Sequence, residues 1–519
     1  MITLINPPLV CRRGDSHSSG IPYLPHGLAY LSAALQKTGL EHEVIDCFGE
    51  KPHHASGGGP YLIMGIPLGE LSRRILSRPR SAIILYANSV FNSHSVFEIA
   101  KSLRGVGGGV PIIVTENTQA VTGFSLLKCI PELLKTPISH AILGESESVL
   151  PHILPYLIEH QEVPEIYRSH VWSPGDMPEG KTNAMTADLD SLPWPAWKRF
   201  PLENYWNLKY AHGPTKEPYL ALLTSRGCPY PCGFCSVPVM NQRKWRMRSA
   251  TNVVDEIAFL VDTFGVREFH WEDLNPTIHE KRMVEISNQI LERKLSIRWR
   301  IVSGTKMDNL KIETLRKMVD SGMDYISFSP ESGSPRVLKA IMKPFQHDHA
   351  RSQVASLSRW NVRTQACFVL GYPGEEETDR QATLKYAKSL LKVGLGEVTY
   401  FIVAPMPGTP IENDIPGSEH ELSDLTFTPC WRSDYTHLIR WRNRLYRSFF
   451  LYRILRTPLV FLQSCFRALT GKTNLKMEMF PRRRFRAWIY ERGLGRNDSP
   501  LAISPVVTPP EADRLASHL

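Results

Sequence analysis

Three cysteines within eight residues constrain this chain of 519 residues more than any other feature. Cys228, Cys232 and Cys235 follow the spacing Cys-x3-Cys-x2-Cys. Three thiolates this close together can wrap an iron-sulfur cube and ligate only three of its four irons. We therefore predict a 4Fe-4S cluster whose fourth iron is open for a small molecule.

A zinc site is the alternative interpretation of the same loop. Zinc knuckles usually combine two Cys-x2-4-Cys pairs, and no second pair follows here, although His212 or His270 could supply a fourth ligand. Disulfides fit the sequence less well, because the nine cysteines are an odd number, six of them are scattered, and no signal peptide precedes them. This pattern is typical of a reducing compartment and predicts a cytoplasmic protein.

Residues 1–157 alternate short β-rich runs with helical patterns. Five such strand-helix steps predict a parallel sheet with helices on both faces, a doubly wound Rossmann-like domain that binds ligands beyond the carboxyl ends of its strands. The fingerprint Gly-x-Gly-x-x-Gly is absent, which disfavours a nicotinamide cofactor. The loop residues expected at the ligand-binding edge are Asn88, Ser89, Glu116, Gly144 and Glu145.

A second α/β unit is predicted at residues 216–415. The preceding segment, 158–215, is rich in proline and predicts a linker over the surface. Six strand-helix units follow, which predict a partial (β/α)6 barrel with its active site at the carboxyl ends of the strands. The cysteine loop directly follows the first of these strands. The strands are expected at 219–223, 268–271, 297–302, 325–329, 364–370 and 398–403.

The positive charge of the chain is concentrated near its C-terminus. Residues 431–496 carry 16 lysines and arginines against three acidic residues, interleaved with aromatic and aliphatic side chains. We expect a basic helical region at 416–496, followed by a proline-rich disordered tail at 497–519. The basic segment suits a helix on an anionic membrane face or a nucleic-acid contact. A helical cap with buried aromatics and solvated arginines is the alternative, and it is slightly favoured. No stretch reaches the roughly 18 apolar residues of a membrane span.

Several short segments occur in a fixed order over roughly residues 1–415. As a set, they are more specific for one protein family than any single motif is. These segments are 4–8 (LINPP), 25–31 (PHGLAYL), 144–147 (GESE), 192–195 (LPWP), 271–275 (WEDLN), 330–334 (PESGS), 370–375 (LGYPGE) and 405–409 (PMPGT). Together with the cysteine loop, they resemble the radical S-adenosylmethionine (SAM) superfamily. The resemblance is to members that carry an N-terminal cobalamin-binding domain, the class B radical SAM methyltransferases.

The resemblance implies that the cluster binds SAM at its open iron and that one-electron reduction releases a 5′-deoxyadenosyl radical. It also implies roles for six further residues. Asp273 and Asn275 correspond to groups that hold the methionine end, and Glu331 and Ser332 to contacts with the methionine or nucleoside. Gly371 lies in the adenine-side turn, and Phe234 flanks the adenine. Helix capping, a tight turn and shielding of the cluster are the structural alternatives for these positions.

Cobalamin is implied by the same resemblance, with the sheet-edge loops of residues 1–157 as its contacts. The signature Asp-x-His-x-x-Gly is absent, so cobalt would have no histidine as its lower ligand. Many cobalamin-dependent radical methyltransferases share that absence. A domain that has lost the cofactor would look the same. His26 and His94 are isolated and are expected to be surface or capping residues.

The resemblance implies methylation of an unactivated carbon of a small molecule or lipid. The first alternative uses the same cofactors for ring formation, rearrangement or oxidation without methyl transfer. A tRNA-modifying methylthiotransferase ranks third, because such relatives carry a second cysteine triplet, whereas Cys11, Cys47 and Cys129 are singletons. A cluster that serves only as a fold staple or sensor ranks last. Expected partners are a one-electron donor such as flavodoxin or ferredoxin and, through residues 431–496, a membrane surface, but not nucleic acid.

Overall fold

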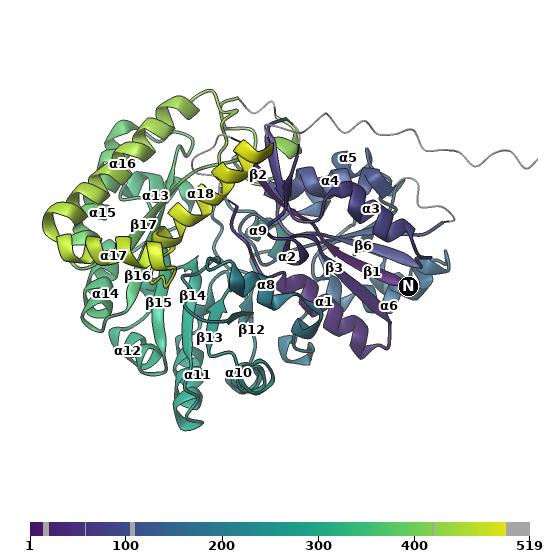
Figure 1. The fold of residues 1–519 in the computed structure, drawn as a ribbon, viewed down its shortest axis with the longest axis horizontal. Helices are drawn as coiled ribbons and strands as arrows, with labels where there is room; N and C mark the ends of the chain where they lie inside the picture. The colour runs from purple at the N-terminus through teal and green to yellow at the C-terminus, as the bar shows by residue number, and fades with distance from the viewer. Residues whose placement is uncertain (14–19, 58, 104–108, 418–419, 495–519) are drawn as a thin grey trace, which may run out of the picture.

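The computed structural model describes residues 1–13, 20–57, 59–103, 109–417 and 420–494. The chain forms two α/β lobes, and three long C-terminal helices run along the second lobe and back toward the first (Figure 1). The tail expected at residues 497–519 lies outside the described residues.

The N-terminal lobe contains a six-stranded sheet in the order β3-β1-β6-β7-β8-β9. Its first five strands are parallel, and β9 is antiparallel. The strands are β1 (Ile2–Asn6), β3 (His42–Asp46), β6 (Ala82–Ala87), β7 (Ile112–Glu116), β8 (His140–Ile142) and β9 (Val171–Trp172). The main helices are α1 (His26–Lys37), α3 (Leu68–Leu76), α4 (Ser93–Ser102) and α6 (Leu150–Ile158). A smaller antiparallel sheet, not expected from the sequence, joins β2 (Leu9–Arg12), β5 (Tyr61–Met64) and β4 (Ala55–Ser56).

Alternate residues of each central strand face two different cores. Leu4 and Ile84 pack with α1 and α6, whereas Ile5 and Leu85 pack with α3 and α4. Because both faces of the sheet are covered, its central strands β1, β6 and β7 are mostly apolar, as is typical of parallel sheets. The predicted doubly wound domain is confirmed.

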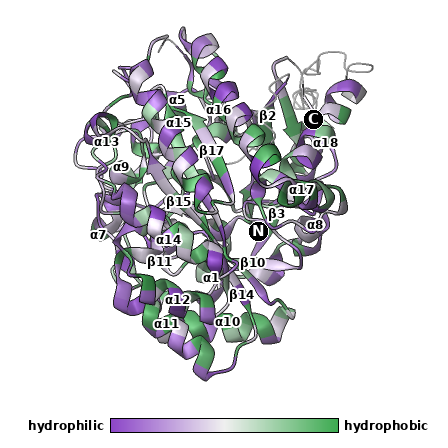
Figure 2. Cartoon of the chain, turned by 90° about the vertical axis from the view of Figure 1, so that its left-hand side faces the viewer, coloured by the Kyte–Doolittle hydropathy of each residue, from purple (hydrophilic) through white to green (hydrophobic). Residues whose placement is uncertain are grey.

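The second lobe is an open parallel sheet whose strand order follows the sequence. Its strands are β10 (Tyr219–Leu222), β13 (Glu268–Trp271), β14 (Arg298–Thr305), β15 (Met323–Glu331), β16 (Arg363–Leu370) and β17 (Glu397–Ile402). Its helices are α10 (Ala250–Phe264), α11 (Glu280–Glu292), α12 (Ile312–Asp320), α13 (Pro335–Ile341), α14 (His347–Arg359) and α15 (Glu377–Lys392). The outer helices alternate hydrophobic and hydrophilic stretches in Figure 2, as amphipathic helices that cover a sheet do. The predicted partial (β/α)6 barrel is confirmed.

The segment 158–215 is more ordered than its proline content indicated. It contains α7 (Glu165–Arg168), β9 and α8 (Leu202–Asn207). Trp197 and Tyr205 are each only 1% exposed and belong to the hydrophobic core that the two lobes share. Aromatic burial therefore fixes this connection, and it is not simply draped over the surface.

Three C-terminal helices close the open side of the barrel: α16 (Tyr435–Arg456), α17 (Pro458–Thr470) and α18 (Lys476–Leu494). Between α17 and α18, Thr473 Oγ1 donates to the carbonyl of Thr215, just before β10. The amides of Lys476 and Met477 donate to the carboxylate of Glu397, at the start of β17. The helices thus bridge the first and last barrel strands. Among the described residues, no helix is long and apolar enough to cross a membrane.

Candidate active site

A cavity of about 1150 Å³ lies between the lobes. Its walls combine the carboxyl edge of the N-terminal sheet, the cysteine loop, the interior of the barrel and the C-terminal helices. Pockets for a single small ligand typically measure 300–1000 Å³. This cavity therefore has room for more than one small molecule.

The cysteine loop lies on the cavity wall. Gly227 opens the loop at a φ of +78°, where a side chain would meet the carbonyl of Lys244. Cys228, Cys232 and Cys235 all line the cavity and lie in or against an apolar cluster that includes Val369 of β16 and Val403, just after β17. Burial raises the pKa of Cys232 to about 11 and raises the pKa of Cys235 well above its usual value, so both thiols hold their protons until a cation compensates the thiolates. The donor set fits an iron-sulfur cluster.

The two histidines considered as zinc ligands are engaged elsewhere. His212 Nδ1 pairs with Glu272 Oε2 at 2.7 Å, and the ring of His270 stacks on that of Tyr219 with centroids 4.4 Å apart. Within the described ranges, no three Cys, His, Asp or Glu side chains are arranged to hold one metal ion. The geometry therefore gives no support to a zinc site.

Asp273 and Asn275 follow β13 but differ in role. Asp273 is fully buried and does not line the cavity. Its carboxylate accepts from the backbone amide of Thr224 at 3.0 Å and from Ser225 Oγ at 2.7 Å, so it fixes the start of the cysteine loop. Asn275 lines the cavity, and its Nδ2 lies 3.9 Å from Cys228 Sγ. Only Asn275 is placed to touch a ligand.

Glu331 ends β15 on the cavity wall with a φ of +61°, a conformation that non-glycine residues rarely adopt. Its carboxylate pairs with Lys343 Nζ at 2.6 Å, and both side chains are buried. Burial alone would lower the pKa of Lys343, but the Glu331 carboxylate outweighs it and raises that pKa. The lysine is therefore a fixed cation in the cavity wall. Ser332 instead shares a hydrogen bond with Thr383 and lies outside the cavity lining.

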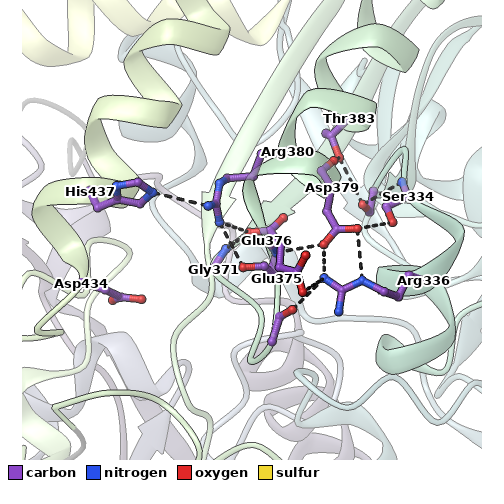
Figure 3. A network of polar contacts seen from close by, with 12 residues as sticks. Ser334, Arg336, Gly371, Glu375, Glu376, Asp379, Arg380, Thr383, Asp434 and His437 are labelled. Atoms are coloured by element: carbon purple, nitrogen blue, oxygen red, sulfur yellow. Dashed lines mark hydrogen bonds and ion pairs between the residues drawn. The ribbon is translucent and has the colours of Figure 1, made fainter.

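The turn after β16 is held by the polar network of Figure 3 rather than by contact with the cavity. Gly371 N donates to Glu375 Oε2 at 2.7 Å. Asp379 accepts from Ser334 Oγ and pairs with Arg336, which ties this turn to the one after β15. Arg380 contacts His437 of α16 in the same network.

Replacing Gly371 with alanine is expected to lower the free energy of unfolding by about 2–4 kcal/mol. Gly371 has a φ of +75°, and a methyl group there would lie 2.5 Å from Leu438 of α16. The midpoint of urea denaturation measures the loss. Gly374→Ala is the matched control, because Gly374 has a φ of +77° and open space around it. Equal losses in the two variants would contradict a steric role for Gly371.

The edge of the N-terminal sheet presents a chain of asparagine amides to the cavity. Asn88 Nδ2 donates to Asn6 Oδ1 at 3.2 Å, and Asn92 Nδ2 donates to Asn88 Oδ1 at 3.0 Å. Asn117 Nδ2 donates to the carbonyl of Asn88 at 3.3 Å. Ser89 lines the same wall. Asn88 and Ser89 therefore lie where a ligand of this domain would be contacted.

Glu116, Gly144 and Glu145 do not line the cavity. The Glu116 carboxylate accepts from the backbone amides of Leu126 and Gly144. Gly144 also forms a backbone bridge with Ala184. Glu145 pairs with Arg246 at 2.7 Å and with Arg226 at 3.3 Å, which ties the sheet edge to the barrel lobe. These residues organise the edge and the contact between the lobes.

Sequence reasoning missed several cavity residues. They share a charged or hydrogen-bonding group and lie on elements far apart in the chain: Tyr23, His26, Lys306, Lys343, Arg442, Lys476 and Arg483. Apart from His26, which lies in segment 25–31, these residues belong to none of the short motifs, and the tertiary fold brings them together. The basic composition of residues 431–496 was the one available signal for the last three.

Comparison with known proteins agrees with this geometry. Residues 222–387 match the Radical SAM superfamily. The chain is 26% identical over 392 residues to an uncharacterized methyltransferase of Pyrococcus horikoshii, covering 74% of this chain and 77% of that protein. It is also 26% identical over 446 residues to the cytidylyl-2-hydroxyethylphosphonate methyltransferase of Streptomyces wedmorensis, covering 79% and 80%.

Two solved structures share the fold of both lobes. The cobalamin-dependent radical enzyme OxsB, with aqua-cobalamin and SAM bound, superposes with a TM-score of 0.60 at 16% identity, covering 95% of this chain and 79% of that one. The methyltransferase TsrM from Kitasatospora setae, with cobalamin and a [4Fe-4S] cluster bound, gives 0.59 at 16% identity, covering 80% and 77%.

Proposed function

We propose that this chain, a radical SAM enzyme by the domain at residues 222–387, uses cobalamin to methylate an unactivated carbon of a small molecule or lipid. One observation carries the proposal. A single cavity joins the cysteine loop, the asparagine edge of the doubly wound sheet and the barrel interior. Relatives that align along most of both chains are named methyltransferases.

The residues present fit the implied cofactors. Cys228, Cys232 and Cys235 would hold the cluster, and the asparagine edge with Ser89 would hold the corrin. When bound, the cluster with SAM supplies a 5′-deoxyadenosyl radical, and cobalamin supplies the methyl group. The chain itself contributes orientation and exclusion of water. Val369, Tyr372 and Val403 pack around the cysteine loop and keep solvent from it.

Isotope transfer tests the proposal. The full-length chain is reconstituted anaerobically with iron, sulfide and hydroxocobalamin, and is then reduced with SAM whose methyl group is deuterated. Extracts of small molecules and lipids serve as substrate. Methylation predicts a product that has gained the labelled methyl group, together with 5′-deoxyadenosine. A product that has lost hydrogens without gaining label would favour the alternative, which is ring formation or oxidation on the same cofactors.

A methylthiotransferase remains the third candidate, and the positions of the N-terminal cysteines do not favour it. Cys11 packs in the core beneath α1, whereas Cys47 and Cys129 lie in the core on the other face of the sheet. The described residues therefore offer no second cysteine triplet in that lobe. Enrichment of tRNA with the purified chain would contradict this ranking.

A one-electron donor of the flavodoxin or ferredoxin class is the proposed protein partner. Cys228 is the most exposed of the three cysteines, which supports electron entry on its side of the loop. We place the enzyme in the cytoplasm, in peripheral contact with a membrane.

The outer face of α17 supports that membrane contact. Leu459, Leu462, Phe466 and Leu469 are 62–81% exposed and share one helical face. The opposite face contributes Phe461 and Ala468 to the cavity. The surrounding helices are rich in arginine, which complements anionic lipid. A lipid substrate would then enter beneath α17.

Replacing both Leu462 and Phe466 with glutamate is expected to weaken binding to phosphatidylglycerol-containing vesicles at least about tenfold. The reason is that two apolar side chains that would insert into the membrane are lost. Flotation of the full-length chain measures the effect. Ile166→Glu is the control, because Ile166 is 74% exposed on α7, away from this face. Failure of the unmodified chain to float with anionic vesicles would contradict the proposed membrane contact.

A further inference from the structure

Arg442 is a buried cation on the cavity wall for which the described residues supply no counter-ion. Its side chain comes from α16, lines the cavity and is only 3% exposed. Within the described part of the chain, neither Nε nor Nη2 has a hydrogen-bond partner. A guanidinium cannot lose its charge in a protein, and burying it unpaired is strongly unfavourable. Such a group is retained where a ligand supplies the missing charge.

Two further cations from α18 line the same cavity. Arg483 is 8% exposed, and its Nε also lacks a partner among the described residues. Lys476 Nζ donates to the carbonyl of Val302 at 2.6 Å, which leaves two of its donors for other groups. Lys476 and Arg483 interact electrostatically with each other and with Glu397. Tyr446, about one helical turn after Arg442, interacts electrostatically with Arg442 and with Glu397, and all three cations line the part of the cavity wall that α16 and α18 contribute.

The acidic residues of the cavity wall are already paired. Glu272 binds His212, Glu331 binds Lys343, and Glu478 binds Arg467 from outside the cavity lining. Glu397, just outside the cavity lining, accepts from the amides of Lys476 and Met477 and from Tyr325 Oη, and its single carboxylate can offset at most one of the cations Lys476 and Arg483. The wall that α16 and α18 contribute is therefore left with an excess of positive charge.

We propose that Arg442, supported by Arg483 and Lys476, binds an oxyanion of the substrate, of the phosphate or phosphonate class. The planar fork of arginine matches two oxygens of such a group. A dianion suits the site better than a monoanionic carboxylate, because more than one cation is uncompensated. The inference rests on the proposed function only in taking the ligand to be the substrate. Anion binding itself is independent of radical chemistry.

Thermal unfolding of the reconstituted full-length chain tests the site. Sodium phosphate is titrated at constant ionic strength, with sodium acetate as the carboxylate arm and dihexanoyl phosphatidic acid as the lipid arm. Phosphate is expected to raise the Tm at concentrations where acetate does not. A further rise with the short-chain lipid would identify a phospholipid as the source of the group, and an equal rise would indicate a soluble phosphate ester.

The most direct test compares the variant Arg442→Met with the unmodified chain. Without anion, its Tm is expected to exceed that of the unmodified chain, because an unpaired buried charge has been replaced by an apolar side chain. The phosphate concentration that half-saturates this variant is expected to rise about tenfold or more, because one charge-assisted hydrogen bond is lost. Arg442→Lys keeps the charge without the fork and should lie between. Arg440→Met, at an exposed position of the same helix, should behave like the unmodified chain.

A lowered Tm of Arg442→Met without anion, or an unchanged response to phosphate, would overturn the inference. Formation of 5′-deoxyadenosine is measured on the same samples. A chain that binds phosphate but makes no 5′-deoxyadenosine would refute the proposed function and leave the anion site standing. The reverse result would refute the anion site alone.

Discussion

Replacing Cys232 with alanine is expected to abolish retention of iron and sulfide and to lower 5′-deoxyadenosine formation at least about a hundredfold. Loss of a direct ligand should exceed the 10- to 100-fold effect of removing an outer-shell partner. Cys232 is one of three thiols on the cavity wall, and the described residues hold no substitute ligand set. Iron and sulfide analysis, the visible spectrum and product detection measure the effect.

Cys367→Ala is the matched control. Cys367 is also buried and lines the cavity, but it belongs to β16 and contacts Ser327 Oγ at 3.5 Å. This variant is expected to retain iron and sulfide. If Cys232→Ala kept both, or if the unmodified chain held one zinc and no inorganic sulfide, the assignment of the loop would be wrong.

Replacing Glu145 with alanine is expected to destabilise the chain by about 3–5 kcal/mol, because breaking a buried ion pair leaves its partners uncompensated. The Glu145 side chain is 1% exposed, and those of Arg226 and Arg246 are 4% and 12% exposed. Arg226 keeps Glu147, but Arg246 loses its only acidic partner in the described chain. The midpoint of urea denaturation at neutral pH measures the loss.

The pH dependence of stability distinguishes this role from contact with a cofactor. Burial alone would raise the pKa of Glu145, but the guanidiniums of Arg226 and Arg246 outweigh burial and hold that pKa below its usual range. The ion pairs therefore contribute stability above about pH 4.5, and the contribution is lost as the pH falls through the lowered pKa. The stabilities of the unmodified chain and of Glu145→Ala are expected to converge in that acidic range. Glu162→Ala, at a surface pair with Arg168, should change little at any pH.

The sequence predicted the architecture well because periodicity is local. Strands such as β1 and β6 are apolar on both faces, and that pattern is typical of a covered parallel sheet. The sequence did not predict that segment 158–215 has a defined structure, because that structure depends on the burial of Trp197 and Tyr205 in the tertiary fold. The small sheet of β2, β4 and β5 was missed for the same reason, since its short strands are specified by pairing partners distant in sequence.

The site was predicted in part. The three cysteines could be singled out from their spacing, because metal-binding loops are specified within a few residues, and all three line the cavity. The acidic residues were harder to assign, since a carboxylate after a strand can face a ligand or a neighbouring backbone. Asn275 and Glu331 face the cavity, whereas Asp273, Glu116 and Glu145 hold the loops in place. Only the hydrogen-bond partners distinguish these roles.

The C-terminal helices occupy the gap between β10 and β17 through a small set of anchors at Thr215 and Glu397. The cysteine loop and the asparagine edge of the N-terminal sheet belong to other elements. Cavity-facing side chains on α16 to α18 can therefore be replaced without a direct change to the cysteine loop or to that edge. This division would let the shape and charge of the cavity be altered through one wall while the other walls keep their structure.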